Sequence, residues 1–271
     1  ETLSNAFSLN IFKNNLKNII IISEKKNNLL YSLSKKLNLF YIEHKNFIGG
    51  RYSVLSEAGI VPAYLMGVNI IKLRANILEV TKKKNKPILK DSTIKLTNLL
   101  FSNKMNNLIF LNYSPQLEQF LFWCQQLIAE SLGKKNKGFL PVVSNAPKDH
   151  HSLLQLYLDG PKDKLFYIFS DHEKSKKRLN IKKIINQTCY FDKKNLNHIK
   201  VAQKNALIKS LKKKKIPFRE FKIKKISEET LGDLFSYFMF ETIIIGRLAN
   251  LNPFDQPAVE QVKLFTKDLL S

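Results

Sequence analysis

The strongest constraint on the fold is a series of short, uninterrupted apolar runs separated by stretches with helical periodicity. Because the apolar residues are continuous and do not alternate with polar ones, we expect strands that are buried on both faces. The runs cover residues 19–22, 39–42, 108–111, 139–143 and 165–169, and helical patterns cover residues 29–37, 116–132 and 153–158. Strands and helices alternating in this way predict an α/β fold with mainly parallel sheets in three α-β-α layers.

The distribution of these elements predicts three parts. Residues 1–48 hold two strands, fewer than an independent doubly wound domain needs, and we interpret them as the carboxyl-terminal remnant of a first domain. Residues 49–105 are predicted to form a helical connection, and residues 106–271 a second domain. That domain should contain a long apolar helix at residues 228–248 and a closing helix that ends at Leu270.

Composition excludes several classes of protein. A hydrophobic content of 44% in 271 residues is enough for a packed core. Cys124 and Cys189 lie far apart, which argues against a metal ribbon or a secreted disulfide scaffold and favours a reducing cytoplasm. The most apolar stretch, residues 234–245, is interrupted by Ser236 and Glu241 and is shorter than the ~18 residues of a membrane span, so we predict no membrane segment.

The formal net charge of +23 is of the size expected for a nucleic-acid binder. Nearly all of this charge is lysine, however, and the lysines form scattered clusters at residues 82–84, 174–177 and 212–215 with few aromatic neighbours. Phosphate and base recognition usually rely on arginine, so we interpret the clusters as solvated surface. A positive field would also raise the encounter rate with a phosphorylated substrate.

Two distant segments carry residues that suit a ligand-binding pocket. Gly-Gly-Arg at residues 49–51 precedes Tyr-Ser-Val-Leu-Ser. The glycines let the backbone approach a ligand, and Arg51 would aim a guanidinium at it. Further along the chain, Asn-Pro at residues 252–253 and Phe-Asp-Gln at residues 254–256 predict a turn before a helix, which would carry Lys263 toward the same pocket.

Two further segments contain candidate acid–base groups. Residues 125–134 read Gln-Gln-Leu-Ile-Ala-Glu-Ser-Leu-Gly-Lys. Gln126 and Glu130 are four residues apart, so they share one helix face and can point into a cleft while the leucine and isoleucine between them pack inward. In the segment Asp-His-His-Ser at residues 149–152, adjacent histidines are more often a surface cap than a metal site, and no further ligands lie at a suitable spacing.

These four segments, in this order, resemble the signature segments of the phosphoglucose isomerase family, over nearly the whole chain from Glu1 to about Lys263. The resemblance implies sugar-isomerase domains that interconvert glucose 6-phosphate and fructose 6-phosphate through an enediolate, in glycolysis and gluconeogenesis, with no metal or organic cofactor. Three positions depart from the usual pattern. His150 stands where relatives commonly have glutamine, and Ala258 and Val262 replace two glycines.

The resemblance also assigns roles. It implies that Glu130 is the catalytic base, that His151 and Lys263 share the opening of the sugar ring, and that Arg51 stabilises the charge on the enediolate oxygen. The substrate contacts that it implies are Gln126, Gln256 and Ser53. Members of the family work as homodimers in which the ring-opening histidine reaches into the neighbouring subunit's pocket. We therefore expect His151 to act in trans and the four catalytic groups to meet around one hexose in the dimer.

One part of the family pattern is missing. Relatives hold the phosphate with an upstream glycine-rich loop and a Ser-Lys-Thr or Ser-Lys-Ser turn, whereas Glu1-Thr2 resembles the Glu-Thr pair that comes directly after that turn. We expect the chain to begin just past its phosphate site and to be inactive alone. Two alternatives remain open: a non-catalytic module that binds sugar phosphates, and a lysine-rich nucleic-acid binder. Mannose 6-phosphate as a further substrate is also left open.

Overall fold

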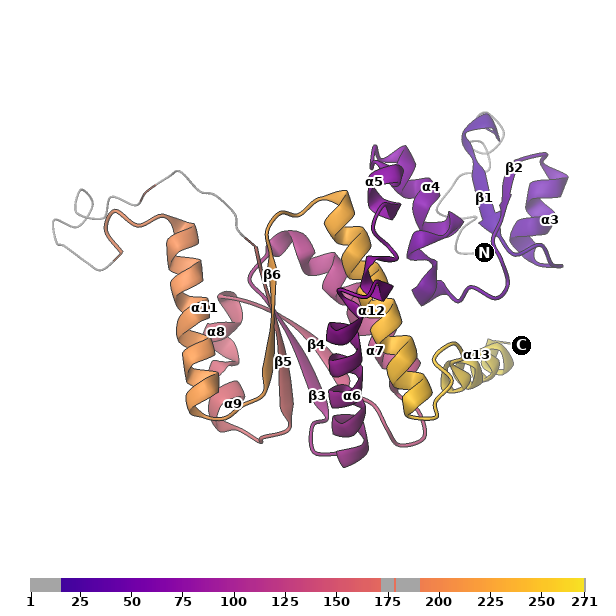
Figure 1. Cartoon of the computed structure of the whole chain (residues 1–271). Coiled ribbons are helices and arrows are strands. Elements are labelled where there is room, and N and C mark those ends of the chain that lie inside the picture. The colour runs from indigo at the N-terminus through magenta and orange to yellow at the C-terminus, as the bar shows by residue number, and fades with distance from the viewer. Residues whose placement is uncertain (1–15, 172–177, 179–190, 271) are drawn as a thin grey trace. The chain divides into compact units, whose positions relative to one another are not determined.

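The computed structural model of the chain describes residues 16–171, 178 and 191–270 (Figure 1). Cys189 and the lysine cluster at residues 174–177 lie outside this described part. The chain divides into two compact units, Glu1–Arg74 and Ala75–Ser271, which we describe separately. The division falls inside the stretch 49–105, and the three-part organisation drawn from the sequence stays a prediction.

The first unit contains a parallel pair of strands joined by a helix. β1 (Ile20–Ser23) pairs with β2 (Phe40–Glu43), and α3 (Leu29–Lys36) connects them. Asn28 caps this helix, because its side-chain oxygen accepts a hydrogen bond from the backbone N–H of Tyr31 at 2.9 Å. The other elements of the unit are η1 (Leu16–Asn18), η2 (Gly50–Leu55), α4 (Glu57–Leu65) and α5 (Ile70–Arg74).

The second unit is built on a four-stranded sheet in the order β4-β3-β5-β6, in which every pair is parallel. Its strands are β3 (Asn107–Asn112), β4 (Leu140–Asn145), β5 (Lys164–Asp171) and β6 (Phe218–Ile223). Its helices are η3 (Glu79–Thr81), α6 (Lys86–Ser102), η4 (Pro115–Leu117), α7 (Glu118–Leu132), α8 (Lys148–Ser152), α9 (Leu154–Asp159), α11 (Leu196–Lys213), α12 (Glu228–Leu248) and α13 (Pro257–Leu270).

Helices cover both faces of this sheet. In Figure 1, α8, α9 and α11 lie on one side of the strands, and α6, α7 and α12 lie on the other. Alternate residues of β3 serve the two faces. Ile109 packs in a buried cluster with Leu207 of α11, whereas the ring of Phe110 lies 6.3 Å from that of Phe238 in α12. The predicted three-layer α/β fold with parallel sheets is confirmed.

Most elements follow the sequence expectations closely. Each of the five predicted strands is present, displaced by no more than a few residues at its ends, and α12 has the predicted bounds. The closing helix α13 also ends at Leu270 as predicted. The sequence patterns did not reveal β6 or α11. Among the described residues, no helix is both long enough and apolar enough to cross a membrane.

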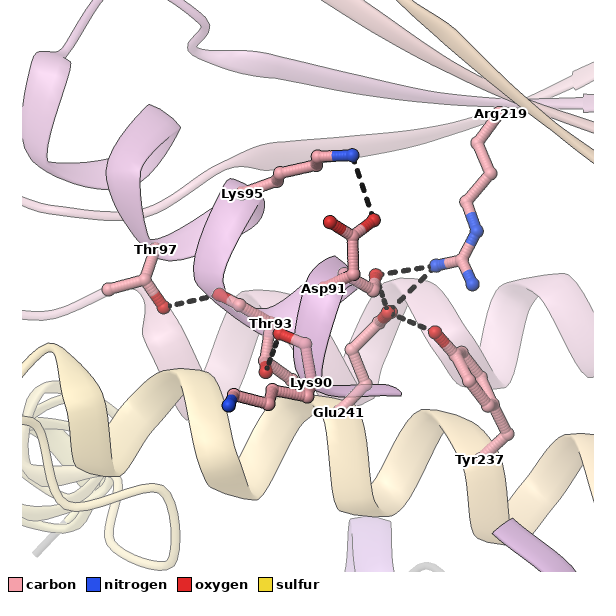
Figure 2. A network of polar contacts seen from close by, with 9 residues as sticks. Lys90, Asp91, Thr93, Lys95, Thr97, Arg219, Tyr237 and Glu241 are labelled. Carbon is pink, nitrogen blue, oxygen red and sulfur yellow. Dashed lines mark hydrogen bonds and ion pairs between the residues drawn. The ribbon is translucent and has the colours of Figure 1, made fainter. Parts of the chain in front are cut away.

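A buried polar network joins α6, β6 and α12 (Figure 2). Its centre is Glu241 of α12, whose side chain is 2% exposed. Glu241 accepts hydrogen bonds from Arg219 at 2.9 Å and from Tyr237 at 2.5 Å. Ser92 of α6 also donates to Glu241, and Arg219 donates to the Ser92 hydroxyl at 2.6 Å. The carboxylate that interrupts the apolar pattern of α12 therefore accepts hydrogen bonds from side chains of three elements.

Candidate active site

Glu130 lies near the end of α7, on the helix face that turns away from the core. Leu127 and Ile128 are 0% and 5% exposed, so they pack inward. Glu130 is half-buried, and its Oε1 accepts a hydrogen bond from Gln126 Nε2 at 3.0 Å. The spacing of four residues therefore joins the two side chains as the sequence analysis expected. An amide that donates to a carboxylate fixes the direction in which the carboxylate points.

A cavity of about 1190 Å³ opens beside Glu130. Gln256 also lines this cavity, while Gln126 and Lys263 do not. The wall consists of the end of α7, the turn that follows it, the residues between α12 and α13, the start of α13, residues just before β3, and the start of β4. The structure thus brings one predicted substrate contact to the predicted base. The cavity is large enough for a sugar phosphate, since small-molecule sites usually span roughly 300–1,000 Å³.

The Gly-Lys sequence after Glu130 has a structural reason. A Cβ on Gly133 would lie 2.6 Å from the carbonyl oxygen of Ala129, so only glycine fits at this helix end. The next residues form a tight two-residue turn, in which Lys134 and Lys137 exchange backbone hydrogen bonds of 2.9 Å in both directions. Lys135 and Asn136 take left-handed conformations with φ of 52° and 56°, as this mirror-image turn requires. The turn forms one wall of the cavity.

Lys263 lies on α13, a helix with no buried residue. Its ammonium pairs with Glu260 Oε1 at 2.7 Å, and its side chain is 61% exposed. Ala258, one of the two residues that replace a family glycine, lines the cavity, whereas Val262 is exposed. The structure therefore places the start of α13 at the cavity and leaves Lys263 outside it.

His151 lies on α8, directly after β4, and its side chain is exposed. Its neighbour His150 is half-buried, and His150 Nε2 lies 2.6 Å from the hydroxyl oxygen of Tyr113. Burial lowers the pKa of His150 from its ordinary value of 6.5, and the nearby Asp149 opposes this shift. Asp149 also accepts hydrogen bonds from the Ser144 hydroxyl at 2.9 Å and the Asn145 backbone N–H at 2.8 Å, which fixes α8 to the end of β4.

Glu130 lies near the amino ends of the strands, and His151 lies near their carboxyl ends. The Glu130 cavity includes Leu140, the first residue of β4, whereas α8 follows Asn145, the last residue of that strand. Six residues of strand span about 20 Å, since each residue adds about 3.3 Å. Groups that transfer protons to one substrate must come within about 3 Å of it. Within a single copy of this unit, the two side chains therefore lie at opposite ends of β4.

Arg51 and Ser53 belong to the first unit, where η2 carries both. The Arg51 side chain is buried, at 3% exposure for the residue, and its guanidinium lies 5.4 Å from the ring centroid of Tyr52. Ser53 Oγ donates to the carbonyl oxygen of Gly50 at 2.7 Å. The steric demand for glycine falls on Gly59 instead of Gly50, because a Cβ on Gly59 would lie 2.1 Å from the Val54 carbonyl oxygen, and one on Gly50 would meet nothing.

Sequence reasoning missed the residues that hold the cavity together. Lys134 contacts Asp255 through an ion pair of 2.6 Å across 121 residues of sequence. The only sequence signal for Lys134 was its place in the Gln-Gln-to-Gly-Lys segment, because a lysine after a helix end is usually exposed. Within the described part of the chain, no three His, Cys, Asp or Glu side chains are grouped as metal ligands.

Comparison with known proteins identifies close relatives. The sequence model of the family "Phosphoglucose isomerase" matches residues 16–271. A probable glucose-6-phosphate isomerase of Methanococcus maripaludis is 32% identical over 280 residues, which cover 100% of this chain and 63% of that protein. The glucose-6-phosphate isomerase of Mycoplasmopsis synoviae is 30% identical over 265 residues, which cover 92% of this chain and 60% of that protein. The chain thus spans less than two thirds of the length of either relative.

Solved structures show the same fold. A hypothetical protein from Thermus thermophilus superposes with a TM-score of 0.84 at 24% identity, covering 100% of this chain and 68% of that one. A glucose-6-phosphate isomerase from Chlamydia trachomatis superposes with a TM-score of 0.76 at 16% identity, covering 96% of this chain and 55% of that one. The match of the family model to residues 16–271 and the relatives at 30% identity or more lead to one conclusion: this chain belongs to the phosphoglucose isomerase family.

Proposed function

We propose that this chain supplies the catalytic base of an aldose–ketose isomerase that interconverts glucose 6-phosphate and fructose 6-phosphate in cytoplasmic glycolysis and gluconeogenesis. Family membership supports the reaction class, and the two relatives described above carry the name glucose-6-phosphate isomerase. The observation that carries the proposal is that Glu130 and Gln256, from segments far apart in sequence, line one cavity of suitable size.

In the proposed mechanism, Glu130 removes a proton from one carbon of the open-chain sugar and returns it to the adjacent carbon. Gln126 holds the Glu130 carboxylate through the hydrogen bond of 3.0 Å. Negative charge that develops on the enediolate oxygen is stabilised by the guanidinium of Arg51. Gln256 and Ser53 provide further substrate contacts, and His151 takes part in the proton transfers that open the ring.

The position of His151 supports a homodimer as the active form. Because α8 and the Glu130 cavity lie at opposite ends of the strands, His151 serves the cavity of a second copy. The exposure of His151 on a short surface helix agrees with such a role, since the side chain can reach outward. In this arrangement each dimer has two composite sites, and each site takes its base from one subunit and its histidine from the partner.

The test is a coupled assay on the complete product of the gene that encodes this chain, with both sugar phosphates as substrates. We expect turnover in both directions. The substitution Glu130→Gln keeps the shape and the hydrogen-bonding capacity of the side chain but removes the base, so we expect kcat to fall about a hundredfold or more while KM changes little. Asp91→Asn, at a carboxylate that is exposed on α6, is the matched control and should have wild-type activity.

Three other results, from binding measurements and from the variant's kinetics, would reject the proposal. Calorimetric binding of a sugar phosphate by a wild-type protein that cannot convert it would indicate the non-catalytic binding module. Retention on DNA or RNA with a steep salt dependence, together with no sugar-phosphate binding, would indicate the nucleic-acid binder. A Glu130→Gln variant that loses binding but keeps turnover at saturation would show that Glu130 is not the base.

A further inference from the structure

We propose that Lys134 is a positioning residue, which ties the segment between α12 and α13 to the end of α7 and thereby keeps Gln256 at the cavity that Glu130 lines. The inference rests on the proposed function, because it assumes that Glu130 and Gln256 act on one substrate. Lys134 itself does not contact the substrate in this proposal. Its role is to hold two distant segments at a fixed separation around the cavity.

The contacts of the Lys134 ammonium carry the argument. Lys134 Nζ donates to the carbonyl oxygen of Asp255 at 2.6 Å, to Asp255 Oδ1 at 2.6 Å and to the carbonyl oxygen of Asn252. The side chain is only 12% exposed. An ammonium group has three N–H donors, and here three acceptors surround it. No donor is left for a phosphate or a sugar hydroxyl, which sets Lys134 apart from a substrate-binding lysine.

The segment that Lys134 holds is itself folded into a compact turn. Asn252 Oδ1 accepts from the backbone N–H of Phe254 at 3.1 Å, and Asn252 Nδ2 donates to Asp255 Oδ2 at 3.0 Å. The Asp255 carboxylate therefore contacts Lys134 through one oxygen and Asn252 through the other. Leu251, just before the turn, is 3% exposed and anchors the segment in the core. Gln256 follows directly, so its position depends on this turn.

The other end of the connection is equally well fixed. Gly133 ends α7 through its backbone N–H, which donates to the Ala129 carbonyl oxygen at 2.9 Å. The two backbone hydrogen bonds between Lys134 and Lys137 then hold the Lys134 backbone in place. Glu130 lies one helical turn before Lys134. The ammonium thus links the backbone that carries the proposed base to the backbone that carries its proposed partner, and both line the same cavity.

Hydrogen exchange on this chain tests the structural part of the proposal without any activity measurement. Lys134→Met keeps the length of the side chain and removes the three donors, so we expect exchange of the backbone amides at residues 250–258 to accelerate about tenfold or more. Lys137→Met is the matched control. It removes the same charge from the same turn, but its ammonium lies 3.8 Å from the centroid of the Phe101 ring. Exchange at residues 250–258 should then be unchanged.

Activity of the complete gene product tests the functional part. We expect Lys134→Met to lower kcat about tenfold to a hundredfold, because a displacement of about 1 Å of a catalytic constellation has an effect of this size. Lys134→Arg keeps the charge but presents a planar fork to acceptors arranged for an ammonium, so it should recover only part of kcat. If Lys134→Met fails to fold, Asp255→Asn removes one charged acceptor and should give a smaller change of the same kind.

The possible failures can be told apart. Unchanged exchange at residues 250–258 in Lys134→Met would overturn the positioning role. Faster exchange with wild-type kcat would show that the segment is held but that its position does not matter for turnover, which also overturns the proposal. A wild-type gene product without isomerase activity would reject the proposed function, and the exchange result would still report whether Lys134 holds the segment.

Discussion

His150 shows how one departure from the family pattern is accommodated at the level of a residue. The side chain is half-buried beside Tyr113, whose own pKa burial raises, so Tyr113 stays protonated and can donate to a neutral His150. A protonated His150 has N–H groups on both ring nitrogens, so it could no longer accept the hydrogen bond from the Tyr113 hydroxyl. The lowered pKa of His150 follows from its burial, with Asp149 only partly offsetting that effect.

This arrangement predicts a pH-dependent loss of stability. Because the pKa of His150 is lower in the folded state than its ordinary value of 6.5, the unfolded chain takes up the proton first as the pH falls. As the pH falls below about 6.5, the free energy of unfolding should therefore decrease, and the decrease should end once the pH is below the folded-state pKa of His150. His150→Gln removes the titrating group and fits the polar site, so its stability should change less over this window. Urea unfolding at a series of pH values measures the difference, and identical pH dependence in both proteins would contradict the account.

Other residues of the site differ in how well the sequence could predict them. The contact between Gln126 and Glu130 follows from helical spacing alone and is present. The contact between Lys134 and Asp255 joins segments more than a hundred residues apart, and nothing local to either position encodes it. Lys263 illustrates a further limit, because the family motif gives its helix but not the direction of the helix from the turn at Asn252.

At the level of elements, the network around Glu241 predicts how α6, β6 and α12 depend on one another. The carboxylate is buried and has partners from all three (Figure 2). Glu241→Ala leaves the Arg219 charge without its partner, so we expect the free energy of unfolding to fall by about 3–5 kcal/mol. Tyr237→Phe removes one hydrogen bond to the carboxylate and should cost about 1–2 kcal/mol.

A double substitution separates burial of charge from loss of packing. Glu241→Leu with Arg219→Met replaces the ion pair by apolar side chains of similar size, so it should be markedly more stable than Glu241→Ala. Asp91→Asn breaks the exposed ion pair of 2.8 Å with Lys95 on α6 and should change stability by less than about 0.5 kcal/mol. Urea unfolding of the chain gives all four values. Equal losses in the double variant and in Glu241→Ala would show that the network is not stabilised as we describe.

The elements that the sequence failed to reveal have physical explanations. β6 is an edge strand, and its residues Phe-Arg-Glu-Phe-Lys-Ile mix apolar and charged side chains, so it lacks the continuous apolar run of a central strand. Arg219 and Glu220 of this strand are neutralised by partners on other elements, which no local pattern shows. α11 is rich in lysine, and one of its buried positions is Lys204, which pairs with Glu220 at 2.5 Å.

At the level of the whole molecule, the sheet itself separates the candidate groups. In a parallel sheet, the carboxyl ends of all strands lie on the same side. Because α7 leads into β4 and α8 follows it, α8 lies at the opposite end of the strands from the end of α7. The motifs predict Glu130 and His151 as site residues, and only the topology shows that in one copy they lie at opposite ends of a strand. In the proposed mechanism, the complete set of acid–base groups therefore comes from two copies.

Complementation between two inactive variants tests this consequence. We expect Glu130→Gln and His151→Asn homodimers of the complete gene product to be strongly impaired. In a heterodimer of the two variants, one site combines the intact Glu130 of one subunit with the intact His151 of the other, and the second site lacks both. Heterodimers isolated through two different affinity tags should therefore recover about half of the wild-type activity. If both groups acted within one subunit, neither site of the heterodimer would be intact, and its activity would stay at the level of the parent variants.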